Sequence, residues 1–505
     1  MIEVMLALGL AVWVVVNIYY VRQPQASLLH PATFYSAVHG FLFVFRPIYG
    51  YFDPFRTIYI IYGFQPTTME RVLALAATQL SFAAFMLVAI RIGAQSPNRT
   101  SVLEDRRRSL RMPVLAVAAV LGPIALYSKL SAIGAKLSGT SSMIMDAETG
   151  LTYNTENVGW FTEAQNMLVP ITVMIAWIFR FKPVALLPLG IYGLLQASTG
   201  GRGVLLFALI ATAMLWLYDQ RRRWPEWRFV AVGMAAIAIF YFVGQDRGAG
   251  VRSIVTGEEY VERITAESET FRGLDHMDYA NMEYVEFVVW YVPERSDTYG
   301  YFIDNLQLFT EPVPRVLWPG KPLGPPIQMF DFYEYGTPIG MSTAVPGYGY
   351  LQGGLLGAAA WAAFLGLLFG FGYRIFARRG DSPLVTLAWV IMLSATILFF
   401  RDGGLLTIAR NSPFLLGPIG AVWLLCAFLA RQNRSLAMQG TLAPMRISRR
   451  SSVVEEQPSG TAMEVPPVAV DVHSSPEPEQ LVPRAWRGRA DRTAQPGRTM
   501  KHRHE

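Results

Sequence analysis

Long apolar stretches recur along the chain, and short polar segments that carry most of the charge separate them. A transmembrane helix needs about 20 predominantly apolar residues. Eleven stretches fit this description, at about residues 2–20, 32–52, 71–93, 112–130, 157–180, 183–199, 203–218, 228–244, 347–372, 383–400 and 413–430. The pattern predicts an all-α polytopic membrane protein with about 11 transmembrane helices.

Arginine-rich segments predict how these helices are oriented. They follow the third, seventh and ninth stretches and contain Arg106, Arg107, Arg108 and Arg111; Arg221, Arg222, Arg223 and Arg228; and Arg374, Arg378 and Arg379. All three segments follow odd-numbered helices and therefore lie on one side, which the positive-inside rule makes the cytoplasm. The first stretch lacks a basic start and a cleavage site, so we interpret it as a retained helix. We expect an external N-terminus and a cytoplasmic C-terminus.

Residues 245–346 form a long segment between predicted helices, and this topology places it outside. A loop of this length without structure of its own would be unusual, and such loops are often functional. Thr256 and Glu259 have capping-box spacing, which predicts a helix to about Arg272. The run MDYANMEYVEFVVWYV predicts a second helix lying along the bilayer surface. We expect a small helical cap, which would suit a membrane enzyme or a receptor.

The chain is thus expected to have four parts. Residues 1–244 hold transmembrane helices 1–8, residues 245–346 form the external cap, and residues 347–430 hold helices 9–11. Residues 431–505 are rich in Arg, Pro, Ser and Glu, which predicts a disordered cytoplasmic tail. That tail is either a solvated segment near anionic lipid or a docking site for a partner.

Composition excludes several classes of protein. Only 16% of the residues are charged and 52% are hydrophobic, whereas about a quarter of a soluble domain is charged. A single cysteine, Cys426, excludes a disulfide framework, and the six histidines have no metal-ligand spacing. We therefore expect no metal and no cofactor. Because the positive-inside rule explains the net charge of +6, we expect no nucleic-acid partner.

Several charges have no explanation in the bilayer alone. Arg202 lies in QASTGGRGVLLF, in an external turn, and either binds an anion at a helix start or reaches toward lipid phosphate. Arg401 and Arg410 lie in FFRDGGLLTIARNS, another short external connection. Arg401 either pairs with Asp402 or joins the other two arginines in a bidentate phosphate clamp.

The external loop offers further candidates. Arg315, Trp318 and Lys321 lie in EPVPRVLWPGKPLGPP, where prolines fix the backbone and the indole offers a plate for a headgroup or a sugar. His276 in GLDHMDY has Asp275 beside it, and is either a general base with a raised pKa or an ordinary exposed histidine.

One more arginine lies within a predicted helix. Arg46, in FVFRPIYGY, falls inside or near the end of the second apolar stretch. A charge inside the membrane is a functional candidate by default. It is also suited to anchor that helix at the membrane interface, so both interpretations stay open.

The order of these features resembles a known family. An outward arginine in STGGRG, a long external loop, VPRVLWPGKP and then STAVPGYGYLQGGLLGAAAW are similar to the Wzy-type O-antigen and exopolysaccharide polymerases of bacterial envelopes. The resemblance covers about residues 190–420. The Arg-x10-Gly spacing of some members is absent, since Ala213 and Ser412 occupy those positions.

The resemblance implies a GT-C-like membrane glycosyltransferase of the bacterial inner membrane. It would join undecaprenyl-diphosphate-linked repeat units on the periplasmic face, with a chain-length regulator (a polysaccharide co-polymerase) as a possible partner. Arg202, Arg315, Lys321 and Arg401 would then face the substrate.

We add Trp318 and Arg410 as substrate-binding candidates, and His276 with Asp275 as the catalytic pair. An O-antigen ligase would share these features, so it remains an alternative. A flippase would place charges along its helices and show internal symmetry. The chain shows neither, so transport is a weaker hypothesis, as is a receptor or scaffold.

Overall fold

The computed structural model describes residues 1–97, 102–137, 143–145, 152–154, 159–198, 202–227, 274–275, 279–313, 317–318, 320–322, 324–332 and 341–441. Most of these residues are helical. The exceptions with regular structure are two short antiparallel strands, β1 (Met143–Met145) and β2 (Thr152–Asn154).

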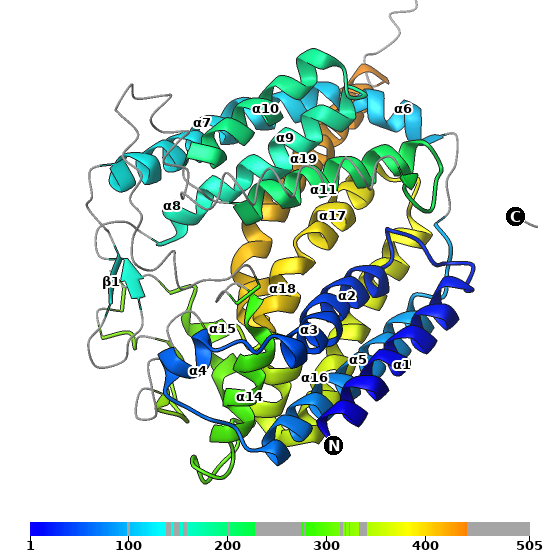
Figure 1. Ribbon diagram of the computed structural model, residues 1–505. Coiled ribbons are helices and arrows are strands. Elements are labelled where there is room, and N and C mark those ends of the chain that lie inside the picture. Colours follow the sequence, from blue (N-terminus) through cyan, green and yellow to red (C-terminus); the bar gives the residue numbers. More distant parts are fainter. Residues whose placement is uncertain are drawn as a thin grey trace, which may run out of the picture. The chain divides into compact units, whose positions relative to one another are not determined.

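Helices follow one another along the whole described chain (Figure 1). The first set is α1 (Ile2–Val21), α2 (Pro31–His39), the π-helical η1 (Gly40–Phe45), α3 (Arg46–Phe52), α4 (Thr57–Tyr62), α5 (Thr68–Ile92), α6 (Val102–Ser109) and α7 (Arg111–Leu137). The second is α8 (Gly159–Glu163), the 3-10 helix η2 (Ala164–Met167), α9 (Leu168–Ile178), α10 (Pro183–Ser198) and α11 (Arg202–Asp219). The third is α14 (Asn281–Tyr291), the 3-10 helix η4 (Ile303–Leu306), α15 (Gln307–Thr310), α16 (Ala344–Arg378), α17 (Pro383–Ser394), α18 (Thr396–Asp402) and α19 (Leu405–Thr441).

The protein is a helical membrane protein. Within the described residues, five helices are long and apolar enough to cross a membrane, namely α1, α5, α16 and most of α7 and α19. The pair α17 and α18, bent by 40°, would make a sixth. Eleven spans therefore remain a prediction: the stretch at 157–180 is divided among α8, η2 and α9, and the stretch at 228–244 lies outside the described residues.

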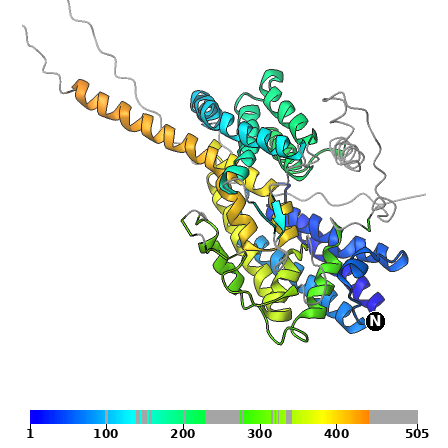
Figure 2. The same ribbon diagram turned by 90° about the vertical axis from the view of Figure 1, so that its left-hand side faces the viewer.

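Small residues allow α5 and α16 to pack closely along much of their length. A Cβ atom added at Gly366 would lie 2.8 Å from the carbonyl oxygen of Phe85, and one at Gly370 would lie 3.3 Å from the Cα atom of Ala89. Close backbone approach of this kind is how membrane helices gain packing energy without a hydrophobic driving force. The α5–α16 pair is contacted by α1, α2 and α14, whereas α7, α10 and α11 contact α9 (Figures 1 and 2).

The long helix α16 is broken at Gly353 and Gly354, where the backbone leaves helical geometry. The two parts approach each other closely next to the break. A Cβ atom added at Gly349, before the break, would lie 2.7 Å from the Cα atom of Ala358, after it. Carbonyls freed by the break accept hydrogen bonds from another segment. The N–H of Gly300 donates to Leu351 O at 3.0 Å, and that of Tyr301 donates to Gln352 O at 3.1 Å.

The three arginine-rich segments come together, as their placement on one side requires. Arg106 donates to the Asp381 carboxylate at 2.7 Å, which joins the α6 segment to the end of α16. Arg107 donates to Asp219 at the end of α11, also at 2.7 Å. Arg378 donates to Gln95, just after α5, at 3.1 Å. The arginine-rich side therefore lies at the C-terminal end of α5.

The helix expected from MDYANMEYVEFVVWYV exists as α14, but its predicted place along the membrane surface is wrong. Every residue of α14 except Trp290 is buried. The helix carries apolar and aromatic side chains on all of its faces, so it packs against α5 and α16 and is not left half exposed. The helix expected from Thr256 to Arg272 lies outside the described residues.

Candidate functional site

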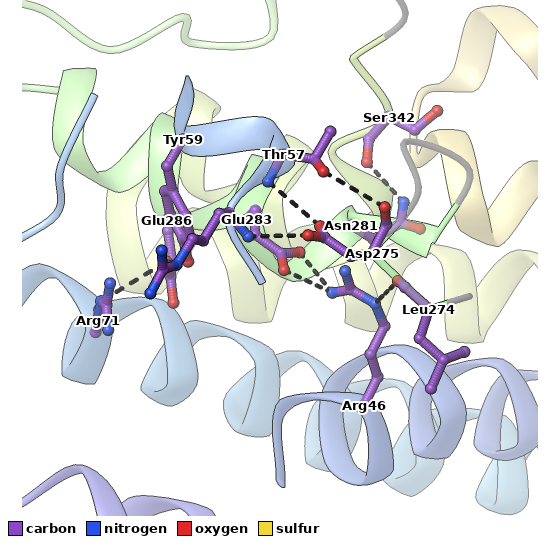
Figure 3. A network of polar contacts seen from close by, with 11 residues as sticks. Arg46, Thr57, Tyr59, Arg71, Leu274, Asp275, Asn281, Glu283, Glu286 and Ser342 are labelled. Carbon is purple, nitrogen blue, oxygen red and sulfur yellow. Dashed lines mark hydrogen bonds and ion pairs between the residues drawn. The ribbon is translucent and has the colours of Figure 1, made fainter. Parts of the chain in front are cut away.

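Among the residues that the structure describes, buried charged side chains gather around α14. Figure 3 shows two of its carboxylates turned toward side chains from α3, α4 and α5. The two carboxylates and the side chains they contact form what we call the α14 network, which consists of Arg46, Tyr59, Arg71, Glu283 and Glu286. The network lies at the N-terminal end of α5, since Arg71 is in its first turn. At 1.5 Å per residue, the 25-residue α5 places it about 37 Å from the arginine-rich side.

Arg46 and Glu283 form a buried ion pair. The Nη1 atom donates to both carboxylate oxygens, at 2.8 and 2.6 Å, and Nε donates to Leu274 O at 3.2 Å. The guanidinium also lies over the Phe55 ring, 4.0 Å from its centroid. The two side chains are only 1% and 5% exposed, so this contact is shielded from water. Both oxygens of Glu283 are engaged by a single cation.

Glu286 has a different environment. The Tyr59 hydroxyl donates to Oε2 at 2.6 Å, and the Nε atom of Arg71 lies 4.0 Å from the same oxygen. Burial, helped by the nearby Glu283, raises the pKa of Glu286 to about 7 against the opposing effects of Tyr59, Arg71 and Arg46. A carboxyl group with this pKa exchanges its proton near neutral pH, as general acids and bases do.

One arginine of the network, Arg71, and a second nearby, Arg295, are partly exposed. Arg71 is 40% exposed, and its Nε atom is buried without a hydrogen bond to any residue in the described ranges. Arg295 is 32% exposed, with Nη1 3.6 Å from the Glu70 carboxylate and the guanidinium 3.9 Å from the centroid of the Trp290 ring. Glu70 also caps α5 by accepting from the N–H of Thr67. Both cations are thus held in place by carboxylates while remaining partly open.

A second polar cluster lies where α14, α16 and α18 begin or end. The Asn281 amide donates to Ser342 O at 2.6 Å and to Arg401 O at 3.3 Å. The Trp361 indole donates to Gly403 O at 2.7 Å. These bonds fix the positions of the short segments around Ser342 and Arg401.

Of the residues predicted from sequence, some lie outside the described ranges. His276 and Arg315 are among them. Arg202 begins α11, and the structure describes its backbone alone. Their roles stay predictions.

Asp275, predicted to orient His276, caps the start of α4. Its carboxylate accepts from the backbone N–H of Arg56 at 3.1 Å and of Thr57 at 3.4 Å. Asp275 follows Leu274, whose carbonyl binds Arg46, so the segment before His276 is tied to the α14 network.

Trp318, Lys321 and Arg410 lie on connecting or end segments. Lys321 Nζ donates to Glu311 O at 2.9 Å and to Val313 O at 3.3 Å, which closes the proline-rich turn on itself. Trp318 is 38% exposed. Arg410 donates to Glu163 at 2.8 Å, pairing α19 with α8.

The α14 network contains residues that the sequence left unassigned. The sequence identifies Arg46 as a charge within an apolar stretch, but it does not identify the partner of that charge. The signal for the carboxylates was present in EYVE, where two glutamates three positions apart share a helix face within a run of aromatic and branched residues. Among the residues the structure describes, no three His, Cys, Asp or Glu side chains are grouped to hold a metal ion.

No protein-family model, no curated protein and no solved structure matches this chain.

Proposed function

We propose that the chain is a Wzy-type polymerase, a membrane glycosyltransferase that joins polyprenyl-diphosphate-linked oligosaccharide repeat units outside the bacterial inner membrane. The observation that carries this proposal is the α14 network, in which a helix from the predicted external loop brings carboxylates to arginines from the helix bundle. The sequence resemblance supplies the family, and the chemistry of the network suits its reaction.

That reaction needs positive charge and a proton acceptor. A lipid diphosphate leaves while a sugar hydroxyl attacks, so negative charge develops on the leaving oxygen. Fixed cations stabilise such charge, and each donor is typically worth 10²–10³ in rate. The partly open guanidinium groups of Arg71 and Arg295 are suited to this role, because arginine binds phosphate in a bidentate manner.

The orientation of the network supports an external site. It lies at the end of α5 opposite the arginine-rich side, which the positive-inside rule assigns to the cytoplasm. In this proposal the site faces the periplasm, with the N-terminus on the same side and the C-terminus in the cytoplasm. The lipid tail of the substrate would lie in the bilayer beside the helices.

The residues predicted from sequence have places in this proposal. Arg202, Arg315, Arg401 and Arg410 would bind diphosphate groups of donor or acceptor, with Lys321 shaping the turn on which Trp318 meets a sugar ring. A chain-length regulator would act as partner, and the GT-C-like fold with about 11 spans is part of the same proposal.

Deletion of the gene followed by analysis of the surface glycan tests the proposal. Loss of a polymerase leaves single repeat units attached at the cell surface. Complete chains that stay on the carrier lipid would instead indicate the ligase, which uses the same donor chemistry with a different acceptor. Units trapped on the cytoplasmic face would indicate a flippase. A normal glycan would contradict all three.

A further inference from the structure

We propose that Glu286 accepts the proton of the attacking sugar hydroxyl, that Tyr59 is a positioning residue that holds its carboxylate, and that Arg71 lies beside this carboxylate while it binds the diphosphate. This inference rests on the proposed polymerase function, and it assigns to Glu286 the proton transfer for which the sequence suggests His276.

The two carboxylates of α14 differ in what they can still bind. Both oxygens of Glu283 accept from Arg46, so its acceptor capacity is engaged by a buried cation. Glu286 is held through Oε2 alone, by the Tyr59 hydroxyl at 2.6 Å. Its Oε1 atom has no hydrogen bond to any residue in the part of the chain that the structure describes. One oxygen is therefore anchored and the other can receive a proton.

The charges around Glu286 fit this role. Arg71 of α5 and Arg46 of α3 favour the carboxylate form, while Glu283 on the same helix and burial disfavour it. The balance leaves the pKa of Glu286 at about 7. A general base works best with a pKa near the operating pH, because it is then both available and basic enough.

The transfer forms one bond and breaks one. The acceptor hydroxyl oxygen forms a bond to the anomeric carbon of the donor, and the bond from that carbon to the diphosphate oxygen breaks. The electron pair leaves with the lipid diphosphate, whose charge Arg71 and Arg295 are placed to stabilise. The hydroxyl proton moves to Glu286, which later releases it to water.

The test uses the full-length protein in proteoliposomes with a defined polyprenyl-diphosphate oligosaccharide as substrate, and measures chain extension from pH 5 to 9. We expect wild-type activity to rise with pH through about 7. Glu286→Gln keeps the shape and can still accept from Tyr59, and we expect a loss of about 10²–10⁴ in rate.

The chain offers a matched control for that variant. Glu3 accepts from the Tyr51 hydroxyl at 2.7 Å, but this pair is exposed at the start of α1. We expect Glu3→Gln and Tyr51→Phe to keep wild-type rates and pH profiles.

Two further variants test positioning without removing the carboxylate. Tyr59→Phe and Arg71→Gln each remove an interaction that lowers the pKa of Glu286. The rising limb of the curve of rate against pH should therefore move to higher pH. A merely structural role would change the amount of folded protein and leave that limb in place.

The outcomes separate the two proposals. A folded wild-type protein with no chain extension overturns the polymerase proposal and this inference with it. Two results overturn the role of Glu286 and leave the polymerase proposal intact. One is a wild-type rate of chain extension in Glu286→Gln, and the other is a pH–rate profile that does not shift in Tyr59→Phe and Arg71→Gln.

Discussion

Arg46 and Glu283 are 237 positions apart in the chain, yet the guanidinium Nη1 of one lies 2.6 Å from a carboxylate oxygen of the other. Their side chains are almost fully buried. This contact ties α14, from the long segment between predicted helices, to α3 near the start of the chain. It also engages both carboxylate oxygens of Glu283, whereas the Tyr59 hydroxyl holds Glu286 through one oxygen.

Removal of one partner of this pair should destabilise the protein strongly. Arg46→Met or Glu283→Gln leaves a buried charge uncompensated, which typically costs about 3–5 kcal/mol. Chemical unfolding in detergent micelles measures the change. Arg106→Ala, which breaks the more exposed pair with Asp381, should cost less than about 1 kcal/mol. Equal losses of unfolding free energy from the two pairs would contradict the burial of the Arg46–Glu283 ion pair.

Stability should fall as pH rises toward neutral. The pKa of Glu286 is about 7 in the folded protein against a usual 4.5, so its contribution is fully present below about pH 4.5 and is lost as pH rises through about 7. At most this amounts to about 3 kcal/mol. We expect the thermal midpoint of the wild type to drop between pH 5 and pH 8 more steeply than that of Glu286→Gln. Parallel slopes would show that Glu286 is not protonated in the fold.

Neighbouring glycines of α16 should tolerate substitution very differently. Gly349→Ala places a Cβ 2.7 Å from backbone at Ala358, and Gly354→Ala must adopt a φ of +63°. We expect both to reduce the yield of folded protein in the membrane. Gly353→Ala is the control, because its added Cβ meets nothing within 4 Å and its φ of −174° is open to any residue. Fluorescence-detected size exclusion compares the three, and a similar loss in Gly353→Ala would contradict the folded-back arrangement.

Arg202 should fail to tolerate lysine. A point charge cannot reproduce the bidentate fork that the proposed diphosphate contact requires. We expect Arg202→Lys to lower polymer formation by about 10²–10³ at matched expression. Polymer length on the cell surface is the measurement, and Arg106→Lys, which keeps a cation beside Asp381 on the arginine-rich side, should make normal polymer. Normal polymer from Arg202→Lys would remove the clamp hypothesis.

Trp318 should matter for substrate use more than for stability. It is 38% exposed, so its loss removes little packing, whereas stacking on a sugar would be worth about 1–3 kcal/mol by analogy with nucleic-acid bases. We expect Trp318→Ala to raise the apparent KM for a lipid-linked oligosaccharide. Trp423 of α19, also exposed, provides the control substitution. An unchanged KM would leave Trp318 as an interface anchor.

Local pattern was sufficient for much of the fold. The apolar stretches within the described ranges form helices, and the arginine-rich segments that were predicted to share one side are joined by Arg106 with Asp381 and by Arg107 with Asp219. What depended on long-range pairing was out of reach. Nothing near Arg46 in the sequence identifies Glu283, because hydrogen bonding across 237 positions leaves no periodic signal.

Two local features were also misleading for physical reasons. The apolar run at 347–372 has the composition of one helix, and only the Gly353–Gly354 pair marks where α16 turns back. The run MDYANMEYVEFVVWYV predicts a helix on the bilayer surface because it combines glutamates with aromatic and apolar residues. Here Arg46 and Tyr59 satisfy the glutamates inside the protein.

Because α14 packs between other helices, the part of the chain that contains α14 cannot be exchanged without breaking contacts to those helices. An exchange of this segment between homologues to alter sugar preference would carry away Glu283 and Glu286 while leaving Arg46 and Tyr59 behind in the host. Chimeras should instead be joined after Tyr291, so that the grafted portion contains the turn around Lys321 and the recipient keeps its own charge pairs.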